Sequence, residues 1–139
     1  MAELKEMQEK ISKYKLLTER LKMFNNRREM VISKVMEIEA CYDTLIEIKP
    51  NQEIKVHLGS GVFVNSIIES TDKVLVTISR DFAMEVDIEK AKEMLVTNKK
   101  TLEQMLDMIE TEMLQMQEEL SKLEPEIRDF VEKQKHSKE

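Results

Sequence analysis

The chain has 139 residues, of which 36% are charged, and it contains only two Gly and two Pro. So few turn-forming residues exclude a sandwich or small barrel, which would need a turn about every 8–12 residues. An aromatic content of 4% without Trp argues against a large compact core. A composition rich in Glu, Lys and Leu is typical of long helices, and the length allows one domain. We therefore expect one elongated, mainly α-helical unit over residues 1–139.

Charge and patterning also limit the partners and the compartment. The formal net charge of −6 gives no general reason to expect nucleic acid as a partner. Charges begin at Glu3 and no run of about 18 apolar residues occurs, so we expect neither a secretory signal nor a membrane partner. The lone Cys41 cannot form an internal disulfide, which suits a reducing compartment. A cytoplasmic protein is expected.

A first long helix is predicted over residues 1–49. Residues 2–48 lack Gly and Pro, and apolar side chains recur in alternating steps of three and four, which is the signature of a coiled-coil seam. One three-residue stammer falls near Tyr14–Leu17, and Arg28 takes one seam position. Pro50 ends the helix because it disfavours the α conformation at Lys49 and has no amide hydrogen. The seam comprises Leu4, Met7, Ile11, Tyr14, Leu17, Leu21, Phe24, Val31, Val35, Ile38, Tyr42 and Leu45.

Residues 50–86 change to the two-residue period of β-strands. Apolar and polar residues alternate over 54–58, Gly59-Ser60-Gly61 predicts a turn, and an apolar run follows over 62–68. A second pair of strands is predicted over 73–78 and 82–86, joined by Ser79-Arg80-Asp81. Four short strands cannot cover their own faces and edges, so two β-hairpins here predict oligomerisation.

A second long helix is predicted over residues 87–139, with Asp87 as its N-cap. A stutter is expected at residues 105–109–113, where two successive steps of four occur. Pro125 is expected to kink or break the last turns, and residues 134–139 to fray. The predicted seam comprises Ile88, Ala91, Leu95, Asn98, Leu102, Met105, Ile109, Met113, Met116, Leu120, Leu123, Ile127 and Phe130.

Charge indicates how the two helices pair. Residues 1–30 carry eight Lys or Arg against five Glu, whereas residues 101–139 carry five Lys or Arg against eleven Asp or Glu. Antiparallel pairing places the basic start of the first helix beside the acidic end of the second. Exposed ion pairs of this kind select the orientation of the helices more than they stabilise the fold. The expected fold is therefore a long antiparallel two-helix coiled coil with two β-hairpins at its root.

No catalytic constellation is evident, and we expect no enzyme, metal or cofactor. His57 and His136 lie far apart without a Cys or carboxylate cluster at ligand spacing. Nothing near Cys41 would lower its pKa, so packing in or beside the seam is the better interpretation. Leu58-Gly59-Ser60-Gly61 lacks the Lys and the following helix of a phosphate-binding loop, and a hairpin turn explains it better.

Methionine and the helix ends are the best candidates for a binding role. Met105, Met108, Met113 and Met116 crowd the second helix, but three of them occupy predicted seam positions and are expected to pack as core. At the free end of a two-helix arm no other element covers the seam, so apolar residues there should be partly exposed and bind a partner. These tip residues are Leu4, Met7, Ile11, Leu120, Leu123, Ile127, Phe130 and Val131.

The sequence resembles an α-class prefoldin subunit. The resemblance covers nearly the whole chain as architecture, and three segments carry it: LGSGVFV at 58–64, DKVLV at 72–76 and EVDIEKA at 85–91. It implies a heterohexamer of two α and four β subunits, whose hairpins form a double β-barrel body bearing six coiled coils. The expected assembly residues are Leu58, Gly59, Gly61, Phe63, Val64, Val74, Val76 and Ile78.

The resemblance also implies a function and exposes one departure. The family captures unfolded chains at coiled-coil tips without ATP and hands them to a group II chaperonin. An alternative within the same architecture is a scaffold subunit of a prefoldin-like complex linked to co-chaperone or transcription machinery. Archaeal α subunits have V-G-x-G at the second turn, whereas this chain has Ile78-Ser79-Arg80-Asp81. That difference favours a eukaryotic subunit or a divergent paralogue.

Overall fold

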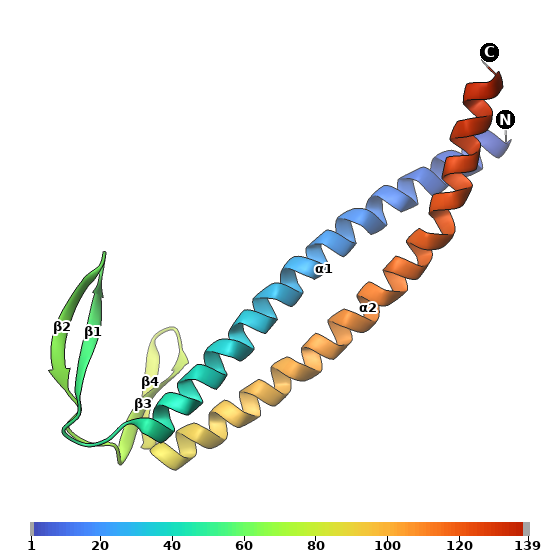
Figure 1. The fold of residues 1–139 in the computed structure, drawn as a ribbon. Coiled ribbons are helices and arrows are strands. Elements are labelled where there is room, and N and C mark those ends of the chain that lie inside the picture. Colours follow the sequence, from blue (N-terminus) through green and yellow to red (C-terminus); the bar gives the residue numbers. More distant parts are fainter. Residues whose placement is uncertain (1, 138–139) are drawn as a thin grey trace. The chain divides into compact units, whose positions relative to one another are not determined.

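The structure is a computed structural model that describes residues 2–137. Two long helices, α1 (Ala2–Glu47) and α2 (Ile88–Ser137), enclose two hairpins in the sequence, as Figure 1 shows. The strands are β1 (Glu53–Gly59), β2 (Val62–Ile67), β3 (Lys73–Ser79) and β4 (Phe82–Asp87). The element order confirms the predicted helix, two hairpins and helix.

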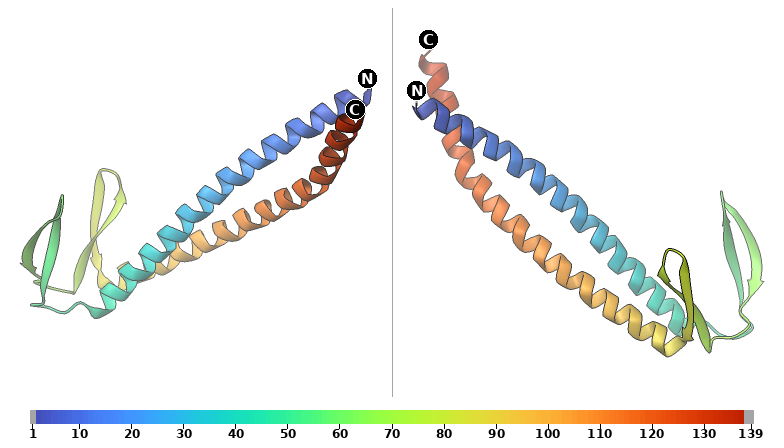
Figure 2. Two further views of the ribbon diagram at one scale, coloured as in Figure 1. Left: turned by 45° about the horizontal axis from the view of Figure 1, so that its top comes forward. Right: turned by 180° about the vertical axis from the view of Figure 1, so that it is seen from behind.

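The chain divides into two compact units. One unit contains the described residues up to Ser33 together with those from Glu103 onward, and the other contains residues 34–102. In the first unit the start of α1 and the end of α2 run antiparallel and side by side (Figure 2). Its buried residues are Leu17, Val31, Ile109 and Met113, all from the predicted seams.

Two interhelical ion pairs confirm the antiparallel pairing expected from charge. Lys10 Nζ lies 2.8 Å from Glu126 Oε2, and Lys13 Nζ lies 3.8 Å from Glu119 Oε2. A hydrogen bond to Glu126 raises the pKa of Lys10 above its ordinary value. These pairs are exposed, so they select the pairing direction more than they add stability.

The predicted seam of α1 is correct, whereas that of α2 is shifted by one residue over part of its length. Asn98 and Met105 are exposed, and their neighbours Lys99 and Leu106 are half-buried. The two successive steps of four residues therefore run from Ala91 through Leu95 to Lys99, and not over residues 105–109–113. A lysine is compatible with this position, because its stem can cover apolar surface while its ammonium group stays at the edge.

In the C-terminal part of α2 the predicted kink is present, whereas the predicted fraying of residues 134–137 is not. Pro125 does not break the helix, which continues to Ser137, although the last, red turns take a different direction from the orange turns before them (Figure 1). A direction change there follows from the amide hydrogen that proline lacks. Residues 134–137 were expected to fray but are helical; Lys138 and Glu139 lie outside the described residues.

The second unit contains both hairpins and the helix segments 34–47 and 88–102. Its buried residues are Ile38 on α1, Val86 on β4 and Ala91 on α2. The hairpins form two separate two-stranded sheets, β1 with β2 and β3 with β4. Backbone hydrogen bonds close both bases, including Asn51 N to Ile68 O at 2.7 Å and Ile88 N to Asp72 O at 3.0 Å.

Candidate functional site

The first hairpin has apolar side chains but buries none of them. Val56 pairs with Val64, and His57 pairs with Phe63, whose ring centroid lies 4.8 Å from that of the imidazole. Nevertheless every residue of β1 is exposed, and Phe63 retains 59% of its accessible surface. An isolated two-stranded sheet is marginally stable in water, and apolar surface of this kind usually marks an interface. The hairpin is thus incomplete within one chain.

The backbone conformation of the first turn accounts for the two glycines in it. Ser60 and Gly61 both have positive φ, 50° and 80°, which is the backbone of a type I′ turn, and Gly59 has φ 113° beside a β-bulge. The amide of Gly61 also donates a hydrogen bond of 3.3 Å to His57 Nε2. A side chain at either glycine would meet no atom within 4 Å, so backbone conformation rather than space selects glycine there.

The second hairpin makes its turn without glycine because the turn does not need it. Ser79 pairs with Phe82, leaving Arg80 and Asp81 as a two-residue loop. Among residues 2–137 the positive φ angles belong only to Asn51 and to the three residues of the first turn. Arg80 and Asp81 therefore keep negative φ, which any residue adopts. The missing glycines do not disturb this hairpin.

In the second hairpin one face is covered near its base and open towards its turn, and the other face is open. Val74 and Val76 are half-buried and Val86 is 8% exposed, whereas Leu75, on the opposite face of β3, is 73% exposed. Alternation along a strand produces this difference. Of the expected assembly residues, Val74 and Val76 therefore lie on the covered side, whereas six are open: Leu58, Gly59, Gly61, Phe63, Val64 and Ile78.

Several exposed apolar residues in the hairpins were missed by sequence reasoning. Strand alternation alone does not show which face a separate hairpin leaves uncovered, although the apolar content of both faces was visible. These residues are Ile54, Val56, Val62, Ile67, Leu75, Phe82 and Met84.

The tip residues belong to the first unit, and four of the eight line two grooves there. Met7 and Phe130 contribute to a groove of about 640 Å³ whose rim carries charged side chains of both signs, including the Lys10–Glu126 pair. Ile11, Phe130 and Val131 line a smaller groove of about 190 Å³. Leu4 is 49% and Val131 43% exposed, and the other tip residues are half-buried. Apolar surface is therefore accessible at these helix ends.

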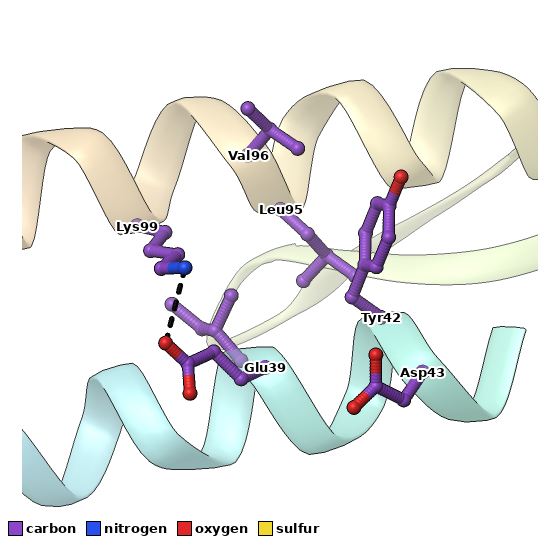
Figure 3. Close-up of a pocket in the computed structure, with 7 residues that line it drawn as sticks. Glu39, Tyr42, Asp43, Leu95, Val96 and Lys99 are labelled. Carbon is purple, nitrogen blue, oxygen red and sulfur yellow. Dashed lines mark ion pairs between the residues drawn. The ribbon is translucent and has the colours of Figure 1, made fainter.

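A separate pocket of about 320 Å³ lies between α1 and α2 within the second unit (Figure 3). Leu95, Val96 and Ile38 supply its apolar lining. Glu39 Oε1 binds Lys99 Nζ at 3.0 Å, marked by the dashed line. The pocket lining contains no nucleophile paired with a base, so it has no recognisable catalytic arrangement.

The remaining candidates are exposed or structural. Cys41 is exposed, so it does not pack within the seam, although it stands next to the seam residue Tyr42 on α1. Met113 is buried and Met116 half-buried as predicted, but Met105 retains 43% of its surface. Within residues 2–137 no group of three His, Cys, Asp or Glu side chains could hold a metal ion. No helix in that range is long and apolar enough to span a bilayer.

Comparison with known proteins identifies the family. The prefoldin subunit family model matches residues 17–133, which is most of the chain and includes both hairpins. This chain belongs to the prefoldin family. The relatives that it resembles are α subunits. One of them, "Prefoldin subunit alpha" from Methanobrevibacter smithii, is 32% identical over 97 residues. That alignment covers 68% of this chain and 66% of the relative, just under two thirds of its length.

Two further prefoldin comparisons agree on class and fold. A "Prefoldin subunit alpha" from Methanococcus vannielii is 23% identical over 107 residues, covering 75% of this chain and 73% of that protein. A filamentous prefoldin from Methanocaldococcus jannaschii, solved by cryo-electron microscopy, superposes with a TM-score of 0.53 at 21% identity, covering 91% of this chain and 98% of the other.

Proposed function

We propose that the chain is a subunit of an ATP-independent holdase that captures unfolded proteins with its tip residues. Membership of the prefoldin family supports a chaperone role. The observation that carries the proposal is the pair of tip grooves, where accessible apolar side chains from both helix ends meet a rim of mixed charge. Apolar surface suits the side chains that an unfolded chain exposes, and charged rims keep the free protein soluble.

The proposal includes assembly with β-class subunits through the hairpins. In the heterohexamer, two α and four β chains combine their hairpins into a β-barrel body. The support is that β1 and β2 bury no residue fully and leave both sheet edges unpaired within the chain. Strand pairing with other subunits would cover the apolar faces and remove the edges. We place the complex in the cytoplasm, where it delivers clients to a group II chaperonin.

Native mass spectrometry of the chain, alone and co-expressed with a β-class subunit, tests the assembly. A species with two copies of this chain and four β subunits is expected. A monomer in both samples would contradict the assembly and leave the tip residues to be tested separately.

The holdase activity is tested by substitutions at the two most exposed tip residues. The double variant Leu4→Asn and Val131→Thr removes apolar character without adding charge, and the assembled complex is mixed with citrate synthase diluted from guanidinium. We expect light scattering to rise several-fold above that of the wild-type complex. The matched control is Leu114→Asn with Val96→Thr, because these residues have similar exposure, 58% and 54%, outside the tip set. Equal protection by both double variants would refute capture by the tip residues.

Delivery and the scaffold alternative require different readouts. Fluorescently labelled client bound to the complex should move to an added group II chaperonin on native gels. Retention of the client on the complex would exclude delivery. Recovery of folded partners by the wild-type complex, with no suppression of aggregation, would instead favour the scaffold subunit linked to co-chaperone or transcription machinery.

A further inference from the structure

One exposed face of the first unit has a pattern that neither hairpin assembly nor the tip residues explain. On α1, Leu16, Met23 and Met30 are spaced by seven residues, so they form one row along the helix. They retain 51%, 54% and 73% of their accessible surface. Exposed apolar residues scattered singly are ordinary, but a straight apolar row beside a groove is typical of a helix-packing surface.

A groove lies beside this row, between α1 and α2. It has a volume of about 330 Å³ and an apolar lining that comes mainly from Phe24, Met105, Met108 and Ile109. Arg27 and Glu112 complete the lining, with the Arg27 guanidinium 5.3 Å from the ring centroid of Phe24. Methionine side chains adapt to irregular apolar surfaces, so the groove suits an inserted methionine or leucine.

The charges of this face are divided between its two helices. Lys13 and Arg20 are seven residues apart on α1, as are Glu112 and Glu119 on α2. Because Lys13 pairs with Glu119 and the helices are antiparallel, Arg20 and Glu112 occupy the next matching level. Yet among the described residues neither Arg20 nor Glu112 forms an ion pair. The face therefore has an unpaired cation on α1 and an unpaired anion on α2.

We propose that this face binds the same face of a second copy of the chain. A two-fold axis parallel to the helices places α1 of each copy on α2 of the other, so Arg20 of each copy meets Glu112 of its partner copy. Met23 of each copy then lies at the level of the groove lined by Met105 and Met108. A two-fold axis perpendicular to the helices would place α1 on α1, with cations facing cations, and is disfavoured. Charge complementarity thus selects both the occupant and its orientation.

This contact is small and supplements strand pairing. One apolar row and two ion pairs fall below the area of a stable interface, so the contact forms when copies are already held close together. It would bring two arms of one assembly side by side.

The test is a crosslinking experiment with charge reversal. Full-length chains carry Cys41→Ser, and one chain carries Met23→Cys while the other carries Met108→Cys, so that a short bis-maleimide joins only unlike chains through this face. Wild-type charges should produce a crosslinked dimer. With Arg20→Glu in both chains, or Glu112→Arg in both, like charges meet at both symmetric positions, and the yield should fall roughly tenfold.

The decisive sample mixes one Arg20→Glu chain with one Glu112→Arg chain. Opposite charges then meet at both positions between copies, whereas like charges remain within each chain, so only a contact between copies restores the yield.

The matched controls Lys22→Glu and Glu110→Arg make the same changes on the same helices at other exposed positions, and should leave the yield unchanged. Failure of the mixed sample to recover would overturn the proposal. So would protection of the Met23→Cys thiol by denatured citrate synthase without any crosslinked dimer, since it would assign the groove to client. Because the contact needs copies that are already held close together, both samples are measured in the assembled complex, and neither result depends on holdase activity.

Discussion

The paired helices and the hairpins of this chain differ in how they bury their apolar side chains. In the paired helix segments, seam residues such as Val31, Ile109 and Met113 are buried within the chain itself. In the hairpins, Phe63 and Leu75 are largely exposed, although the strands are as apolar as the seams. A coiled coil covers its stripe with one partner helix, which the same chain supplies, whereas a two-stranded sheet has two faces and two edges. The helices are therefore complete in one chain, and the hairpins depend on other chains.

The largest effect is expected from a charge in the first hairpin. Phe63→Asp should abolish hexamer formation because it places a carboxylate on the surface that other strands would cover. Native mass spectrometry should detect smaller species, while far-ultraviolet circular dichroism retains the helical signal. Asn65→Asp is the matched control, since Asn65 lies on the same face of β2 and is already polar. An intact hexamer with Phe63→Asp would show that this face is not an interface.

The next effect concerns the seam. Ile109→Ala should lower the free energy of unfolding by about 2–5 kcal/mol, because it removes packed atoms and leaves a cavity. Leu114→Ala, five residues along α2 but 58% exposed, should change it by less than about 0.5 kcal/mol. Urea unfolding followed at 222 nm measures both values. Equal losses would mean that α2 does not bury this seam in solution.

A seam substitution is also expected to stabilise the chain. Arg28 takes a seam position, and its Nε is buried without a hydrogen-bond partner. Replacing it with leucine should raise the free energy of unfolding by about 1–3 kcal/mol, since the cost of the unsatisfied donor is removed. Lys22→Leu, at an exposed position of α1, is the control and should have little effect. Destabilisation by Arg28→Leu would show that the guanidinium has a partner in the assembled protein.

The smallest effect is expected from the Lys10–Glu126 pair and depends on pH. The pKa of Lys10 is raised in the folded chain by its hydrogen bond to Glu126. Its contribution is therefore complete below the unfolded lysine pKa of about 10.4 and disappears as pH rises through the higher folded value. Lys10→Gln should lower the melting temperature slightly at pH 8, and the difference from wild type should vanish near pH 12. Lys5→Gln serves as the control, and a difference that persists at high pH would exclude the ion pair as its cause.

The extent to which the structure was predictable differs between the helices and the hairpins. The period of the apolar residues, the position of Pro50 and the Gly59–Gly61 turn located all six elements. The exact seam of α2 was not predictable near Asn98 and Lys99, because a lysine can half-bury its stem and keep its charge at the edge. The second turn forms where the sequence predicts it without glycine, because glycine is needed only where φ is positive and Arg80 and Asp81 do not require it.

The candidate sites were also predictable only in part. The tip residues followed from the seam and the expected free end, and the structure adds that Met7, Ile11, Phe130 and Val131 line grooves. The groove at Met105 and Met108 was not foreseen, because Met105 had been placed in the seam and a one-residue shift turns it outward.

The sequence by itself determined which segments become helix and strand, because period, proline and glycine act locally. It also determined the antiparallel pairing, because the opposite charges of the two helix ends allow one favourable direction. Only the tertiary structure decided which side chains share a surface. Burial depends on the phase of each helix relative to its partner and on how far each side chain reaches, so the unpaired Arg20 and Glu112, the groove beside them and the open hairpin faces became visible only with the chain folded.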